Sequence, residues 1–137
     1  MSFQLNFSHR HKYQYLEAGI TLDVVLSYGG NEFQCKAKVD TGAQYCLFSR
    51  EVGELLGIDV ESGVRQDFRT LTGALTAFGH ELTIGTLGEL FHTTVYFAKE
   101  YNLPRNLLGR QGWLQLVRLA IIDYDEELYL SLYNDQI

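Results

Sequence analysis

The stretch Val39-Asp40-Thr41-Gly42-Ala43 decides how this sequence is interpreted. It ends a run over residues 32–39 in which apolar and polar residues alternate, which predicts a β-strand. A carboxylate and a glycine directly after a strand are typical of a tight turn. The tripeptide Asp-Thr-Gly is a weak signal alone, because three residues recur by chance, so the interpretation depends on the flanking elements.

The flanking elements have clear signals. Residues 20–26 predict a strand, and Tyr28-Gly29-Gly30-Asn31 predicts the turn that joins it to the strand ending at Val39. Further on, Ser49 is typical of a helix N-cap and Gly57 of a helix stop. The turn is therefore expected between a β-hairpin and a short helix.

The rest of the chain predicts more strands. The expected elements are a glycine-interrupted hairpin at 69–79, strands at 82–84 and 91–97, a short helix at 111–117, and a closing hairpin of strands 119–122 and 128–132. Thirteen glycines, one proline and many aromatic and β-branched residues favour short strands and tight turns. The sequence thus predicts an all-β, barrel-like fold with one or two short helices.

The composition limits the class of protein. With 137 residues, of which 46% are hydrophobic, the chain is expected to form a single domain over residues 1–137. The net charge of -6 and the lack of a Lys/Arg-rich stretch argue against nucleic acid as a partner. The apolar run at 119–122 is too short to cross a membrane. Two cysteines and no visible secretory signal predict a reduced, cytoplasmic protein.

Residues 1–15 are expected to form either a mobile arm or a strand at a dimer interface. His9 and His11 lie close together there, but no third metal ligand with suitable spacing is visible. A metal site is therefore not expected in this segment.

Three motifs occur in an order found in one known family. They are the turn at residues 39–43, the helical phrase at 49–58, and Asn106-Leu107-Leu108-Gly109-Arg110. In this order they resemble the retropepsins, which include the retroviral proteases and the cellular domains of the DNA-damage-inducible type. The resemblance extends over residues 19–132. It implies a retropepsin-like closed barrel, one half of an acid protease, with aspartic endopeptidase activity.

The resemblance also implies which residues form the site. The catalytic loop would consist of Asp40, Thr41 and Gly42, with Thr41 hydrogen-bonding to the loop of a second chain. The residues that would contact substrate lie in the loop, in a flap near residues 73–78 and in the segment 106–110. They are Ala43, Gln44, Gly73, Ala74, Leu75, Thr76 and Leu108. Leu107, Gly109 and Arg110 would support the catalytic loop. No cofactor and no metal are expected.

The chemistry of carboxylates points to the same reaction. Two carboxylates held close together share one proton, because both cannot ionise at once, so one activates water while the other protonates the peptide carbonyl. The sequence contains Asp-Thr-Gly once, at Asp40, and no Asp-Ser-Gly. One chain supplies half of such a pair. A homodimer that acts on a peptide or protein is therefore expected, with its two-fold axis between the two loops.

Alternatives remain at this stage. Retroviral relatives carry a carboxylate at the position of Gln44, where it pairs with an arginine that matches Arg110, and Gln44 cannot form that ion pair. Asp40 itself could be a plain turn carboxylate. The chain could also be a dimeric retropepsin-fold module that binds or scaffolds peptides with little hydrolysis. If the order of the motifs is coincidence, it is an unrelated all-β binding domain.

Overall fold

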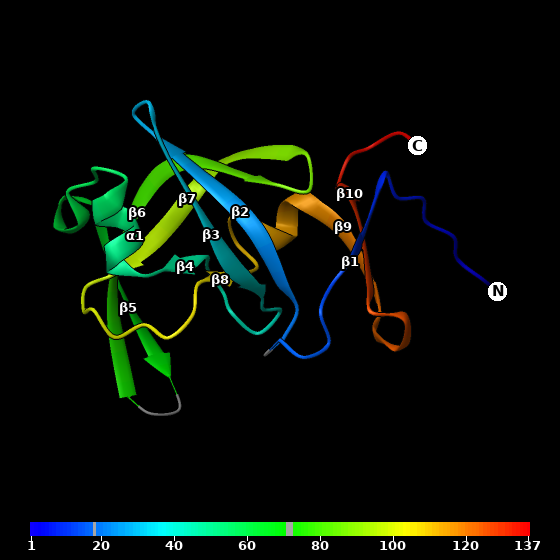
Figure 1. Ribbon diagram of the computed structural model, residues 1–137, viewed down its shortest axis with the longest axis horizontal. Helices are drawn as coiled ribbons and strands as arrows, with labels where there is room; N and C mark the ends of the chain where they lie inside the picture. The colour runs from blue at the N-terminus through cyan, green and yellow to red at the C-terminus, as the bar shows by residue number, and fades with distance from the viewer. Residues whose placement is uncertain (18, 71–72) are drawn as a thin grey trace.

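The computed structural model describes residues 1–17, 19–70 and 73–137 and consists mainly of β-strands (Figure 1). The strands are β1 (His9–Lys12), β2 (Thr21–Tyr28), β3 (Asn31–Val39), β4 (Leu47–Phe48), β5 (Val64–Thr70), β6 (Gly73–Thr86), β7 (Glu89–Ala98), β8 (Leu107–Leu108), β9 (Val117–Ile122) and β10 (Glu127–Leu132). The helical elements are α1 (Arg50–Leu55) and three 3-10 turns, Val60–Ser62, Leu114–Leu116 and Asp123–Asp125.

The described strands form two sheets. The larger sheet has the order β2-β3-β8-β4-β7-β6-β5, and an additional pairing of β2 with β6 partly closes it into a barrel. The smaller sheet has the order β1-β10-β9 and lies at the end of the molecule where both termini are found (Figure 1). The predicted all-β, barrel-like class with short helices is confirmed.

The hairpin that leads to Asp40 forms as predicted. β2 and β3 pair in antiparallel register from Thr21↔Lys38 to Tyr28↔Asn31. The two glycines of the turn have positive φ angles, a conformation that glycine adopts without steric cost. Leu22, Val24 and Leu26 are buried, whereas Asp23 between them is exposed and Val25 is half-buried. This alternation fixes the register, because a slip by one residue would expose the buried set.

The short helix after the Asp-Thr-Gly turn also agrees with its sequence signals. The hydroxyl of Ser49 accepts a hydrogen bond from the amide of Val52 at 3.4 Å, which caps the helix N-terminus. Gly57 has a φ of +80° and ends the helix. The α-helix covers only Arg50–Leu55, and Val52 turns its side chain into the core.

Two expected elements differ from the structure. Residues 82–84 are in a strand as expected, but this strand is not separate, because β6 runs without a break from Gly73 to Thr86. Residues 111–117 do not form a helix beyond one 3-10 turn. Gly112 has a φ of +102°, and the backbone of Gln111 forms a bridge with Tyr45, so neither residue is free to begin an α-helix.

The hairpin predicted at 69–79 is present and its arms are longer than expected. β5 and β6 pair from Val64↔Gly79 to Thr70↔Gly73. Leu71 and Thr72 lie outside the described residues. The hairpin β5–β6 therefore projects from the larger sheet as an extended two-stranded arm (Figure 1).

The smaller sheet joins the two ends of the chain. β1 pairs with β10 from His9↔Leu130 to Lys12↔Glu127, and β10 pairs with β9 as the predicted closing hairpin. Residues 9–12, within the segment expected as a mobile arm or an interface strand, are paired with β10 along their whole length. His9 Nε2 lies 3.2 Å from Glu89 Oε1, and this contact connects the smaller sheet to β7.

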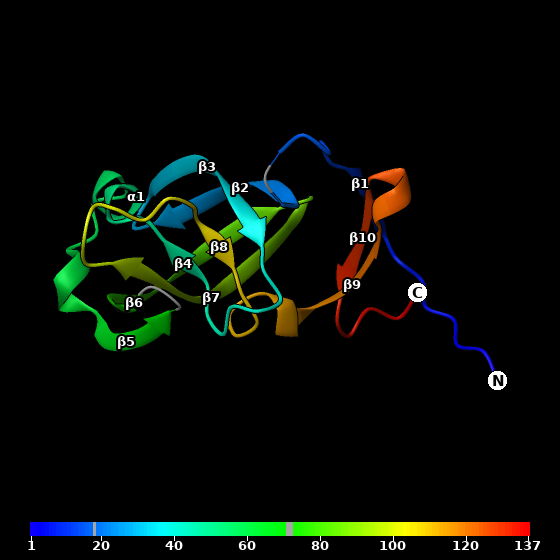
Figure 2. The ribbon, with the colours of Figure 1, turned by 90° about the horizontal axis from the view of Figure 1, so that it is seen from below.

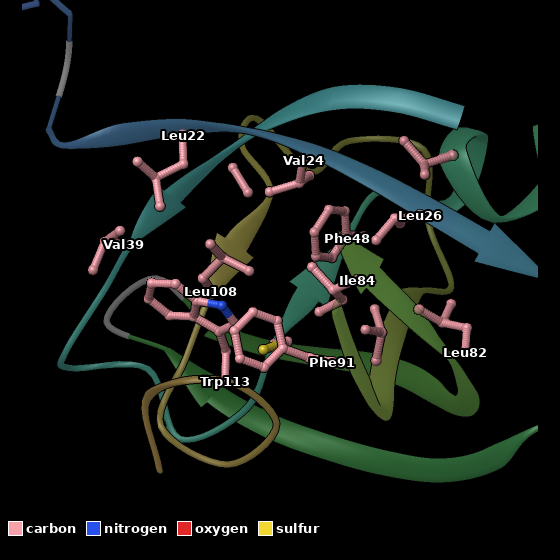
Figure 3. Close-up of a cluster of buried hydrophobic side chains, with 14 of the residues drawn as sticks. Leu22, Val24, Leu26, Val39, Phe48, Leu82, Ile84, Phe91, Leu108 and Trp113 are labelled. Atoms are coloured by element: carbon pink, nitrogen blue, oxygen red, sulfur yellow. The ribbon is translucent and has the colours of Figure 1, made fainter. Parts of the chain in front are cut away.

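The core lies between the curved layers of the larger sheet (Figure 3). Its largest fully buried side chains include Trp113, Phe48 and Phe97. The ring of Trp113 packs edge-on against Phe91 with centroids 6.3 Å apart. Among the described residues, no helix is long and apolar enough to cross a membrane.

Candidate active site

The Asp-Thr-Gly turn lies where β3 ends beside β8 (Figure 2). β8 pairs with β3 in parallel through Lys38↔Leu107 and Val39↔Leu108. The amide of Asp40 continues this ladder and donates to the carbonyl of Leu108 at 3.0 Å. The backbone of Asp40 is thus held by a segment that follows it much later in the sequence.

The side chain of Asp40 is oriented by its own turn. The amide of Gly42 donates to Asp40 Oδ1 at 2.9 Å, and the amide of Ala43 donates to the carbonyl of Asp40 at 3.2 Å. Asp40 is half-buried, whereas Thr41 and Gly42 at the tip are exposed. The turn therefore fixes one carboxylate oxygen and leaves the tip of the loop open to a partner or substrate.

Asn106 connects β3, which leads into the catalytic turn, to the N-terminus of α1, which follows it. Its amide nitrogen donates to the carbonyl of Lys36 at 2.9 Å, and its Oδ1 accepts from the amide of Ser49 at 3.0 Å. The side chain therefore binds β3 on one side and the N-cap of the helix on the other. It holds both ends of the segment that contains Asp40 at a fixed separation.

Residues 109–111, which follow β8 and are called the chain crossing below, are close-packed against the catalytic loop. The amide of Arg110 donates to the carbonyl of Ala43 at 2.8 Å, and the amide of Gln111 donates to the carbonyl of Gln44 at 2.8 Å. A Cβ atom at Gly109 would lie 2.2 Å from the carbonyl oxygen of Tyr45 and 2.9 Å from that of Ala43. Only glycine fits there, because both contacts are to backbone atoms.

The two leucines of β8 have different surroundings. Leu108 is fully buried in the core beside Val39 and Trp113, and Leu107 is half-buried (Figure 3). A substrate contact by the Leu108 side chain, as expected from the sequence, is incompatible with this burial. Leu108 instead supports the loop through its carbonyl group, which accepts from Asp40.

The hairpin residues expected to cover the substrate lie at the start of β6. Gly73 and Ala74 are exposed, while Leu75 and Thr76 are half-buried. The hydroxyl of Thr76 donates to Asp67 Oδ1 at 2.8 Å, and this hydrogen bond lowers the pKa of the Asp67 carboxyl group. The contact joins the two strands of the arm on its outer face.

Three aromatic rings connect this arm to the catalytic loop, and the sequence did not predict them as a group. The ring centroids of Tyr45 and Tyr96 are 5.0 Å apart, those of Tyr45 and Phe68 are 5.5 Å apart, and those of Phe68 and Tyr96 are 5.7 Å apart. Tyr45 follows the loop, Phe68 belongs to β5 and Tyr96 to β7. Tilted and edge-to-face rings at these distances attract one another, so the cluster holds the arm near the loop.

Two grooves open beside the loop. The first, of about 210 Å³, is lined by Gly42, Gln44, Arg110, Gln111 and Gln115. The second, of about 300 Å³, is lined by Tyr45, Thr93, Thr94, Tyr96, Gln111, Gly112 and Gln115. They share Gln111 and Gln115, so one continuous surface leads from the glycine of the catalytic turn to the tyrosines of the aromatic cluster.

Both cysteines are free thiols, and Cys46 lies directly beneath the site. Burial raises the pKa of the Cys46 thiol from 9.0 to about 11, although the amide of Gly109, 3.4 Å from Sγ, favours the thiolate. Among the described residues, no group of three or more His, Cys, Asp or Glu side chains is placed to hold a metal ion.

The raised pKa of Cys46 predicts a loss of stability in alkaline solution. The folded chain disfavours the thiolate, so the contribution of Cys46 to the free energy of unfolding is fully present below pH 9. This contribution is lost as the pH rises toward 11, and the loss is about 2–3 kcal/mol. Urea unfolding at a series of pH values should show this fall in the wild type and a smaller fall in Cys46→Ala. Equal slopes in the two proteins would contradict the assignment.

Comparisons with known proteins agree with this geometry. Residues 24–111 match the sequence profile of the family described as aspartyl protease. The match covers more than half of the chain, and the chain therefore belongs to the aspartyl protease family. A search of curated protein sequences gave no significant match.

Solved structures define the fold more closely. A retropepsin-like aspartic protease from Rickettsia conorii is similar with a TM-score of 0.67 and 19% identity, over 90% of this chain and 99% of that chain. EIAV protease in complex with the inhibitor HBY-793 is similar with a TM-score of 0.55 and 22% identity, over 71% of this chain and 86% of that chain. The fold is the retropepsin-like fold.

Proposed function

We propose that the protein is a homodimeric aspartic endopeptidase in which Asp40 of each chain supplies one carboxylate of the catalytic pair. The main observation behind the proposal is that hydrogen bonds hold both the backbone and the side chain of Asp40 in place. Its amide is bound by Leu108 and its Oδ1 by the amide of Gly42. A carboxylate held in this way is preorganised, so little reorganisation is needed when the reaction begins. Membership of the aspartyl protease family supports the same chemistry.

The need for a second chain follows from the number of catalytic turns. The sequence contains one Asp-Thr-Gly, and its tip at Thr41 and Gly42 is exposed. The Thr41 hydroxyl makes no hydrogen bond with any residue that the structure describes. Two loops facing each other across a two-fold axis would bring the Asp40 carboxylates together, and each Thr41 could then bond to the opposite loop.

The proposed reaction is general acid–base hydrolysis. The ionised Asp40 takes a proton from water, whose oxygen attacks the peptide carbonyl carbon. The protonated Asp40 of the other chain donates its proton to the carbonyl oxygen, which gives a neutral diol. As the C–N bond breaks, the first carboxyl group passes its proton to the leaving nitrogen, and a diol hydroxyl returns a proton to the second. The pair again shares one proton.

The arm β5–β6 is proposed as the cover of this site. An extended peptide would lie between the arm and the catalytic loop, with Ala43 and Gln44 below it and residues 73–76 above it. A hairpin of this kind excludes water once it closes and opens to release products. Leu107, Gly109 and Arg110 would serve as backbone support for the loop.

A cleavage assay at several protein concentrations tests the proposal. Purified protein should hydrolyse members of a diverse peptide pool, and the rate per chain should fall on dilution when the dimer dissociates. Sedimentation measured over the same concentrations should show the change from dimer to monomer. A rate per chain that stays constant where only monomer is present would contradict the shared site. Peptide binding without turnover would instead identify a binding module.

A further inference from the structure

We infer that Arg110 is a specificity residue that binds an acidic side chain of the substrate peptide. The inference rests on the proposed function and adds the class of substrate. It begins from the groove next to the catalytic turn, in which Arg110 is the one charged residue among the described lining residues. An acidic side chain means aspartate or glutamate, whose planar carboxylate matches the guanidinium fork.

The backbone of Arg110 is fixed by the catalytic loop. Its amide donates to Ala43 at 2.8 Å, and its carbonyl group accepts from the amide of Gln115 at 3.0 Å. The preceding residue, Gly109, is in close contact with the backbone of Tyr45. The guanidinium group is therefore attached to a rigid part of the site, and its distance from the loop is limited by the length of one side chain.

The side chain of Arg110 is exposed, and its guanidinium group has no partner among the described residues. It makes no hydrogen bond or ion pair with any residue in the described ranges 1–17, 19–70 and 73–137. Several other arginines are engaged by an acidic side chain or a backbone carbonyl group: Arg10, Arg50, Arg65 and Arg118. Arg110 thus keeps its full capacity to donate hydrogen bonds to a ligand.

The described lining around Arg110 contains neutral groups only. Gln44, Gln111 and Gln115 contribute amides, and Gly42 contributes backbone. No carboxylate among these lining residues competes for the guanidinium group, whereas an anion that enters the groove meets one positive charge and several hydrogen-bond donors. Because the groove begins at Gly42, a peptide bound at the catalytic turn passes directly over it.

The test compares peptides that differ only by Glu or Gln, placed at successive positions on either side of the cleaved bond. At one position we expect wild type to favour Glu by roughly 5- to 10-fold in kcat/KM, as for a charge-assisted contact at a partly exposed site. Arg110→Gln should remove the preference. Gln44→Glu should reduce it, because the new carboxylate competes for Arg110. Arg10→Gln is the matched control: it removes the same charge from β1 in the smaller sheet, outside the proposed site, and should keep the preference.

Binding provides a second readout that needs no hydrolysis. Fluorescence anisotropy of labelled Glu and Gln peptides on Asp40→Asn protein should show the same preference and the same loss with Arg110→Gln. If wild type cleaves no peptide, the proposed function fails while the binding comparison still decides the role of Arg110. An unchanged Glu preference in Arg110→Gln would overturn the inference. If the Arg110→Gln dimer dissociated while that preference stayed unchanged, Arg110 would contact the second copy of the chain and not the substrate.

Discussion

Replacing Asp40 by asparagine is expected to reduce peptide hydrolysis by at least roughly 1,000-fold, since the change removes the acid–base group from both halves of the proposed pair. Folding should be retained. The asparagine side chain would keep an oxygen at the place of Oδ1, which accepts the amide of Gly42 at 2.9 Å, and the backbone bond to Leu108 does not involve the side chain. The measurements are kcat/KM on a peptide cleaved by wild type and urea unfolding of both proteins.

A matched control separates loss of chemistry from loss of charge. Asp125 is an exposed aspartate in the turn between β9 and β10, far along the chain from the site, and Asp125→Asn makes the same change in net charge. This variant should cleave peptides at the wild-type rate. If Asp40→Asn also kept that rate, Asp40 would be a turn residue and the proposed mechanism would be wrong.

The second large effect is expected from Gly109→Ala. The added Cβ would lie 2.2 Å from the carbonyl oxygen and 2.5 Å from the carbonyl carbon of Tyr45. These atoms belong to backbone that is bridged to Gln111, so they cannot move aside as a flexible side chain could. We expect a loss of roughly 3 kcal/mol or more in the free energy of unfolding. Peptide hydrolysis should fall as well, because Leu108 holds Asp40 from the adjacent position.

Gly30→Ala is the appropriate comparison for this variant. Gly30 has a φ of +86° in the turn between β2 and β3, and nothing lies within 4 Å of the position of an added Cβ. Its cost is therefore limited to backbone strain, about 1–2 kcal/mol. Urea unfolding should rank Gly109→Ala well below Gly30→Ala in stability. Equal losses would show that the contact at Gly109 can relax, and the crossing would not be as rigid as described.

Local signals in the sequence predicted the elements around Asp40. Ser49 and Gly57 bound the helix because their effects act within a few residues: one caps the first amides and the other adopts a positive φ. The hairpin before Asp40 was predictable for the same reason, since the glycine turn and the alternating pattern on either side specify one register. These elements place the catalytic turn without reference to distant residues.

One glycine with a role in packing led to a wrong strand boundary in the prediction. The sequence predicts that a hairpin ends at Gly79, yet β6 continues through this residue. A Cβ at this position would lie 2.8 Å from the ring of Tyr96, so the glycine makes room for an aromatic side chain on the paired strand. The sequence signal for a turn glycine and for a contact glycine is the same, and only the position of Tyr96 distinguishes them.

The rest of the site depends on contacts between distant segments. Tyr45, Phe68 and Tyr96 have no shared pattern in the sequence, although their rings form one cluster. The direction of the Leu108 side chain was also not predictable, because a two-residue strand shows no alternation. The surroundings of Leu108 are set by the position of β8 between β3 and β4. The sequence resemblance identified this segment but not which atoms it contributes.

The late position of β8 has a consequence for protein synthesis. Asn106, which binds the carbonyl of Lys36, follows that residue by 70 positions, and Leu108 comes later still. On the ribosome, Asp40 therefore emerges on the order of 5–10 s before its support does, at ordinary rates of elongation. During that interval the loop lacks the ladder that fixes it. We therefore expect no proposed hydrolysis by a nascent chain before residues 106–108 have been made and paired with β3.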